Sequence, residues 1–273
     1  MALPVALQLY TVREDLAKDF EGTVKKVAEM GYQGVEPAGL SLPVAEMKAI
    51  FEKYNLACVS SHVPLATLAA DIEGEVKKCK ELGLKYVVIP YLPDGERPGQ
   101  AGYEKTLADM KAIAEECKKQ DMTELYHNHD FEFIKVGDKY ALDLMYETIP
   151  ADLLQTELDT CWVNVGGEDP VKYVEKYAGR APVVHLKDFV MPGKKPAKMY
   201  DLIGIEDDGE KADADAFSFM PVGYGVQNIP AILEAAEKAG AEWVVVEQDQ
   251  PAKGATAMES AKLSREYLKK LGW

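Results

Sequence analysis

The chain has 273 residues, which is long enough for one α/β barrel or for two small domains. It carries 46 acidic and 31 basic residues, and its net charge of -15 would repel a phosphate backbone, which argues against a nucleic-acid partner. The apolar runs are too short for a membrane span, the first residues lack the pattern of a signal peptide, and the four cysteines are widely spaced. We therefore expect a cytoplasmic protein with reduced thiols and no membrane partner.

Predicted strands and helices alternate along the chain. Short apolar runs indicate strands at residues 5–9, 34–36, 57–61, 86–89, 124–127, 153–158, 182–186 and 243–246. Apolar residues at helical spacing indicate helices at residues 14–30, 43–54, 101–119, 142–149, 170–177, 230–239 and 257–270, and in the stretch that ends at residue 82. Gly31, Gly83 and Gly240 each follow a predicted helix, and we expect them to be C-caps.

Two segments depart from this alternation. Residues 132–140 predict a small hairpin that turns at Gly137 and Asp138. Residues 190–219 are rich in Lys, Asp, Gly and Pro and show little periodicity, and a loop this long is usually functional. We expect this long loop between strand seven and helix seven to be a lid or an interface arm.

Eight strands that are each followed by a helix predict a (β/α)8 TIM barrel, with residues 1–273 as a single domain because no linker divides the chain. The alternative is an open doubly wound sheet. The first strand-to-helix turn, LYTVRED, lacks the glycine-rich phosphate fingerprint of that fold, and this favours the barrel.

The residues that end each strand indicate the chemistry, because the catalytic face of a TIM barrel lies at the carboxyl ends of its strands. Seven of the eight predicted strands end in polar residues, mostly at positions i and i+2, which share one face of a strand. They are Gln8 and Tyr10, Glu36, Ser60 and His62, His127 and His129, Glu157 and Asp159, His185 and Lys187, and Glu247 and Asp249.

Four of these residues, one from each of four successive strands, are candidate metal ligands: His127, Asp159, His185 and Glu247. Imidazole and carboxylate ligands suit one divalent ion of manganese, cobalt, iron, zinc or magnesium, and the nitrogen ligands favour manganese or a similar transition metal. The alternative for each residue is an ordinary hydrogen bond near the barrel rim. Several ionisable groups buried without a ligand or metal would be costly, so we expect a metal site.

Further candidates surround this site. His129 and Lys187 would lie beside the metal ion and nearer the rim, as general base and oxyanion stabiliser, unless they face the surface. Glu157 would lie deeper than Asp159 and could hold a histidine ligand. The residues expected to contact substrate are Gln8, Glu36, His62, Glu157 and Asp249.

Five segments resemble, in the same order, the xylose-isomerase-like TIM barrels: LYHNHDFEF, LDTCWV, VVHLKDF, VGYGVQNIPAIL and WVVVEQD. This superfamily contains sugar phosphate isomerases and epimerases, keto-polyol dehydratases and endonuclease-IV-like enzymes, and the similarity runs along the full chain. Its members hold one divalent metal ion with Glu, Asp, His and Glu from strands five to eight, and Asp159, His185 and Glu247 match three of these positions. His127 stands where the family usually has Glu, and the YHNH sequence is more similar to inosose-dehydratase-like members. Trp162 replaces a substrate-contacting histidine of many relatives.

The resemblance implies removal of a proton next to a carbonyl, through an enediolate. It predicts a metal-dependent isomerase or epimerase of a sugar or sugar phosphate, with His129, Glu247 and Lys187 as catalytic groups. The first alternative is an inosose-type or keto-sugar dehydratase, a lyase with the same metal site. An abasic-site endonuclease, which the acidic composition opposes, and a non-catalytic sugar-binding barrel are further alternatives. The expected partner is a small carbohydrate or polyol, and the sequence is compatible with a homo-oligomer.

Overall fold

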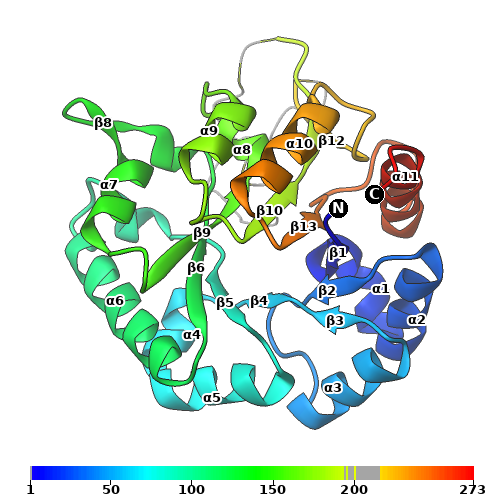
Figure 1. The fold of residues 1–273 in the computed structure, drawn as a ribbon, viewed down its shortest axis with the longest axis horizontal. Coiled ribbons are helices and arrows are strands. Elements are labelled where there is room, and N and C mark those ends of the chain that lie inside the picture. Colours follow the sequence, from blue (N-terminus) through cyan, green and yellow to red (C-terminus); the bar gives the residue numbers. More distant parts are fainter. Residues whose placement is uncertain (1, 194, 196–199, 201–215) are drawn as a thin grey trace.

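A ring of parallel strands surrounded by helices forms the centre of the molecule (Figure 1). The computed structural model describes residues 2–193, 195, 200 and 216–273. The predicted TIM barrel is confirmed. Most of the predicted long loop at 190–219 lies outside the described residues, and its role as a lid or an interface arm stays a prediction.

The ring closes through a strand that is interrupted in its middle. Its neighbouring strands follow the order β3-β2-β1-β13-β10-β9-β6-β5-β4. Their bounds are β1 Val5–Gln8, β2 Gly34–Glu36, β3 Ala57–Cys58, β4 Ser60–His62, β5 Tyr86–Ile89, β6 Thr123–His127, β9 Leu154–Asp159, β10 Val183–Leu186 and β13 Trp243–Val246. Only Val59 separates β3, which pairs with β2, from β4, which pairs with β5. A bridge between Ala38 and His62 joins the two ends, so β3 and β4 together supply the third of eight strand positions.

Helices cover the outside of the ring (Figure 1). Their bounds are α1 Arg13–Lys18, α2 Phe20–Met30, α3 Val44–Lys53, α4 Leu65–Ala70, α5 Ile72–Leu82, α6 Tyr103–Lys119, α7 Ala141–Thr148, α8 Thr160–Val165, α9 Pro170–Lys176, α10 Ile229–Ala239 and α11 Ala257–Lys270. Short 3-10 helices are η1 Leu9–Val12, η2 Asp94–Glu96 and η3 Phe131–Phe133. Gly31, Gly83 and Gly240 end α2, α5 and α10 with φ of 88°, 93° and 82°, which confirms the three predicted C-caps. Within the described part of the chain, every helix is too short or too polar to cross a membrane.

Two helices predicted as continuous are each divided in two by an aspartate. Asp19 separates α1 from α2, and its carboxylate accepts a hydrogen bond from the backbone N–H of Gly22 at 2.9 Å. Asp71 separates α4 from α5 and accepts one from Gly74 at 3.1 Å. Each aspartate has a non-helical backbone and caps the amino terminus of the second helix, so the chain turns there instead of continuing one long helix.

Two small antiparallel sheets accompany the barrel. The predicted hairpin is confirmed as β7 Lys135–Val136 and β8 Lys139–Tyr140. The prediction of an irregular segment over 190–219 is wrong at its ends, because β11 Asp188–Val190 pairs with β12 Ser218–Met220. Strands of three residues are too short to show a period in the sequence.

The barrel interior has an apolar half and a polar half. Its lower half is filled by apolar side chains, namely Ala6, Val59, Tyr86, Val88, Leu125, Val183 and Val245. Polar side chains occupy the carboxyl ends of the strands above this layer. All eight strand positions run in parallel, so these polar side chains meet at one end of the barrel.

Candidate metal centre

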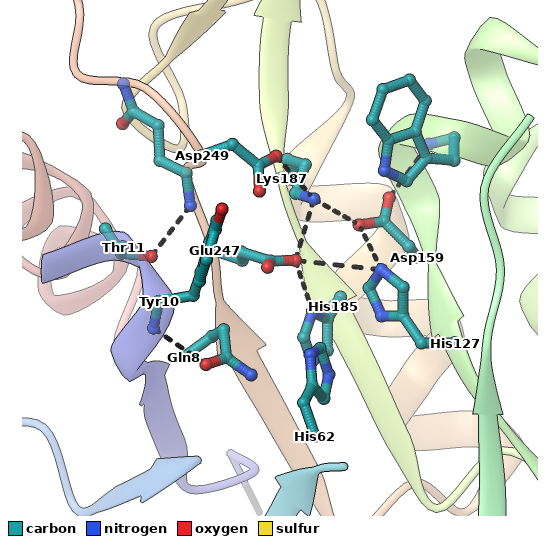
Figure 2. A network of polar contacts seen from close by, with 12 residues as sticks. Gln8, Tyr10, Thr11, His62, His127, Asp159, His185, Lys187, Glu247 and Asp249 are labelled. Atoms are coloured by element: carbon teal, nitrogen blue, oxygen red, sulfur yellow. Dashed lines mark hydrogen bonds and ion pairs between the residues drawn. The ribbon is translucent and has the colours of Figure 1, made fainter. Parts of the chain in front are cut away.

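The strand register places polar side chains at two depths inside the barrel (Figure 2). His127 lies beside Glu157 in the pairing of β6 with β9, and Asp159 lies beside His185 in the pairing of β9 with β10. Alternate residues of a strand share a face, so Glu157 and Asp159 both point inward, with Glu157 the deeper of the two.

The upper group consists of the four predicted metal ligands. His127, Asp159, His185 and Glu247 are buried, and one donor atom from each lies within 4.8 Å of the others. His127 Nε2 lies 3.7 Å from Asp159 Oδ2 and 3.9 Å from Glu247 Oε2. His185 Nδ1 lies 3.0 Å from the same Glu247 oxygen. The structure therefore brings together the four side chains that the sequence singled out.

A divalent ion fits this group on two observations. Asp159 Oδ2 is buried and has no hydrogen-bond partner among the described residues, although Lys187 Nζ lies 3.3 Å away. The donor separations of 3.0 to 3.9 Å approach the roughly 3.0 to 3.4 Å expected between neighbouring ligands of an ion with bonds of about 2.1 Å. Two imidazoles and two carboxylates are also a suitable donor set for manganese, iron, cobalt or zinc.

Lys187 lies above this group as a buried counter-ion (Figure 2). Its ammonium lies 2.8 Å from Glu247 Oε2 and 2.9 Å from Asp249 Oδ2. Burial lowers the pKa of Lys187, but the carboxylates of Asp249, Glu247 and Asp159 outweigh burial and hold it well above its usual value. Burial likewise opposes the ionisation of Glu247, yet Lys187 and His185 hold its pKa well below its usual range. Lys187 and Glu247 are therefore charged.

The lower group connects three histidines through one carboxylate oxygen. Glu157 Oε1 lies 2.6 Å from His62 Nε2, 3.0 Å from His127 Nδ1 and 3.0 Å from His185 Nε2. Burial opposes the charge of Glu157, but His185 and His62 hold its pKa well below its usual range. All four residues are buried, and Glu157 has no exposed surface.

Glu36 extends this lower group. Its Oε2 lies 2.8 Å from His185 Nε2 and accepts a hydrogen bond of 2.8 Å from the side-chain amide of Gln8, and Ser60 donates to its other oxygen. Burial, followed by the charge of Glu157, raises the pKa of Glu36 to about 7. Gln8 and Glu36 have no exposed surface, as is also true of Glu157.

A cavity of about 280 Å³ opens above both groups. It is lined by Tyr10, Ala38, His62, Pro64, Pro90, Tyr91, His127, His129, Lys187, Glu247 and Asp249. Of the five predicted substrate contacts, His62 and Asp249 line this cavity. Gln8, Glu36 and Glu157 do not line it. Beneath the cavity, Gln8 donates to Glu36, and Glu36 and Glu157 both contact His185.

Sequence reasoning missed the wall formed by Tyr91 and its neighbouring prolines. Tyr91 lies three residues after Val88, whose side chain points into the barrel, so Tyr91 is out of step with the inward-facing positions of β5. The i, i+2 spacing that identified the other strand ends therefore could not have found it. The β5 run itself ends in apolar residues and was the one strand without a polar end.

His129 lies outside the metal group, in an aromatic wall of the cavity. Its ring stacks on Phe131 with centroids 5.7 Å apart and meets the edge of Tyr91 at 5.1 Å. Burial, followed by the charges of His127 and Lys187, lowers the pKa of His129 well below its usual value. Its Nδ1 is buried without a hydrogen-bond partner among the described residues. A neutral imidazole with an available nitrogen can accept a proton.

Comparisons with known proteins identify the family of the chain. Residues 24–271 match the family model described as xylose isomerase-like TIM barrel. An inosose dehydratase of Geobacillus kaustophilus is 23% identical in an alignment of 272 positions. The alignment covers 91% of this chain and 86% of the relative. An inosose dehydratase of Clostridium beijerinckii is 25% identical in an alignment of 283 positions, which covers 93% of this chain and 91% of the relative. The crystal structure of a sugar phosphate isomerase/epimerase from Parabacteroides distasonis superposes with a TM-score of 0.78 at 22% identity, covering 98% of this chain and 94% of that one. The chain belongs to the xylose isomerase-like TIM barrel family.

Proposed function

We propose that the protein is a divalent-metal-dependent enzyme that removes a proton next to the carbonyl of a small keto-sugar or keto-polyol. The observation that carries this proposal is the position of the four-ligand group beneath a cavity that a neutral, unpartnered His129 also lines. A metal site and a base that share one cavity are the two parts that enolisation of a carbonyl compound needs.

Each side chain of the site has a separate role in the proposed reaction. A divalent ion held by His127, Asp159, His185 and Glu247 would polarise a carbonyl and stabilise negative charge on its oxygen. His129 accepts the neighbouring proton, and the ammonium of Lys187 adds positive charge beside the developing oxyanion. Tyr10 and Tyr91 form apolar walls of the cavity and exclude water from it.

Isomerisation or epimerisation is the first outcome of this chemistry. It requires that a proton return to carbon from a group in the cavity. Glu247 and His129 both line the cavity, and either can return a proton that it has first accepted from the substrate, so the catalytic residues predicted from the sequence remain the ones we propose. The substrate is then a sugar or a sugar phosphate.

Dehydration is the second outcome, and one residue favours it specifically. Burial raises the pKa of Asp249 to about 6, although Lys187 opposes this shift. A carboxyl with such a pKa is partly protonated near neutral pH and can protonate a leaving hydroxyl. The relatives named inosose dehydratase support the same outcome, with a keto-polyol as substrate.

Product analysis in deuterated water separates these functions. The manganese-loaded protein is incubated with a panel of ketoses and inososes, and the products are followed by proton NMR. We expect loss of the C–H signal next to the carbonyl. An epimer or isomer that carries solvent deuterium identifies an isomerase, and an unsaturated product that has lost water identifies a dehydratase. The proposal would be contradicted if every compound of the panel kept its C–H signal. It would also be contradicted if Asp159→Ala still exchanged this hydrogen for deuterium.

A further inference from the structure

Two groups of potential metal ligands overlap in the barrel, because they share two histidines. The upper group is His127, Asp159, His185 and Glu247, and the lower group is His62, His127, Glu157 and His185. An imidazole has two ring nitrogens on different sides of the ring, so a histidine can serve both groups only if it offers a different nitrogen to each.

The ring orientations show this division, and Figure 2 shows the half of it that faces Asp159 and Glu247. His127 directs Nε2 toward Asp159 and Glu247 and directs Nδ1 toward Glu157. His185 does the opposite, with Nδ1 toward Glu247 and Nε2 toward Glu157 and Glu36. The two histidines therefore present unlike nitrogens to the upper group.

Distances decide which group is open to an ion. The three nitrogens around Glu157 Oε1 lie 2.6, 3.0 and 3.0 Å away, which are lengths of N–H···O hydrogen bonds. The separations of 3.7 and 3.9 Å from His127 Nε2 to the upper carboxylates are too long for hydrogen bonds. The lower group is thus filled by contacts of hydrogen-bond length. The upper group holds one such contact, from His185 Nδ1 to Glu247 at 3.0 Å, and its atoms open to a metal ion are His127 Nε2 and Asp159 Oδ2, which has no hydrogen-bond partner among the described residues.

We propose that Glu157 is the positioning residue of the metal centre. Its Oε1 accepts the Nδ1–H of His127 and lies 3.0 Å from Nε2 of His185, and these two contacts direct Nε2 of the first ring and Nδ1 of the second toward one ion. Glu36 accepts the Nε2–H of His185 at 2.8 Å, but Glu157 is the carboxylate that contacts both rings. Glu157 acts beneath the cavity, so it does not contact substrate. The inference rests on the proposed metal dependence of the protein.

Metal affinity tests this role without reference to turnover. Metal-free wild type, Glu157→Gln and the matched control Glu124→Gln are titrated with Mn²⁺ by calorimetry. Glu124 is also a fully buried acid, and it lies on β6 outside both groups. We expect Glu157→Gln to bind Mn²⁺ about 10- to 100-fold more weakly, the usual effect of losing a carboxylate that orients a histidine ligand, and Glu124→Gln to match wild type. Equal affinity of all three proteins would overturn the role of Glu157, whereas a wild type that binds no Mn²⁺ would contradict the proposed function itself.

A second measurement does not depend on whether a variant of Glu157 folds. The protein has four histidines, so ¹⁵N labelling of histidine gives a simple spectrum of the zinc-loaded wild type, with zinc as the diamagnetic probe. His62→Gln and His129→Gln assign two of the four rings by loss of their signals. We expect the other two rings to coordinate zinc through unlike nitrogens, one through Nε2 with its proton on Nδ1 and one through Nδ1 with its proton on Nε2. Coordination of both rings through the same nitrogen would overturn the proposal.

Discussion

His127 and His129 lie two residues apart on one chain segment, yet their environments differ. His127 belongs to the metal group, and His129 lies in the aromatic wall without a polar partner for Nδ1 among the described residues. We predict that His127→Ala loses bound metal, whereas His129→Ala keeps it and loses turnover by roughly 10²- to 10⁴-fold, the usual contribution of a general base. Metal content by elemental analysis and the deuterium-exchange rate check both variants. Metal loss in His129→Ala with metal retained in His127→Ala would contradict the assignment.

Glu124 is a buried acid that the proposed chemistry does not use. It has no exposed surface, and neither carboxyl oxygen has a hydrogen-bond partner among the described residues. Burial raises its pKa well above the usual value. A pKa that is higher in the folded state than in the unfolded state gives stability that is present below the unfolded pKa of about 4.3 and lost as pH rises through the folded pKa.

The prediction concerns the pH dependence of stability. Glu124→Gln removes this titration, so its free energy of unfolding should fall less than that of wild type between about pH 5 and pH 8. Urea unfolding at several pH values in this range measures the difference. A difference in the free energy of unfolding between the two proteins that stays constant with pH would show that Glu124 is ionised in the folded state.

At the scale of elements, the capped breaks at Asp19 and Asp71 shape two helical connections. Each aspartate accepts a backbone N–H of the following helix, so we predict that Asp71→Ala lowers the free energy of unfolding by about 1 kcal/mol. Glu115→Ala, on an exposed position of α6, is the control and should change it by less than about 0.5 kcal/mol. Chemical denaturation compares both variants with wild type. An effect of Asp71→Ala no larger than that of the control would mean that the cap adds nothing to stability.

Much of the barrel could be predicted from the sequence, because each strand is a short apolar run and the helices repeat at regular intervals. The divided helices could have been found from a repeated pattern, since DFEG at 19–22 and DIEG at 71–74 share the capping aspartate and the glycine that donates to it. The helix α8 and the strands β11 and β12 were missed because they are too short to show a period.

The sequence could predict which residues form the site, but it was less able to predict how deep each one lies in the barrel. Residues at i and i+2 of parallel strands must meet at one end of a barrel, which is why the four candidate ligands could be chosen. The depth of Glu157 relative to His127 depends on the register between β6 and β9, which no single strand reveals. Gln8 and Glu36 were therefore expected in contact with substrate but lie beneath the cavity. Glu157 lies there too, and its two predicted roles, substrate contact and support of a histidine, differ in outcome because it contacts histidines and does not line the cavity.

At the scale of the whole molecule, a metal ion would be coordinated by residues from four strands of the barrel. Binding to the folded state alone stabilises a protein by about 2.7 kcal/mol when the free ligand is at 100 times its Kd. We predict that Mn²⁺ at such a concentration raises the unfolding temperature by several degrees in wild type and in Glu124→Gln, but not in Asp159→Ala. Calorimetric scans with and without the ion test this. An equal rise in Asp159→Ala would place the stabilising ion elsewhere.

The position of the ion is the most direct test of the central claim, that His127, Asp159, His185 and Glu247 hold one divalent metal ion. Crystals grown with Mn²⁺ and measured at an energy where manganese scatters anomalously would locate it. We predict one strong anomalous peak per chain, within bonding distance of all four side chains. A fully exchanged crystal without a peak there, or with its peak among His62, Glu157 and the lower nitrogens, would contradict the account.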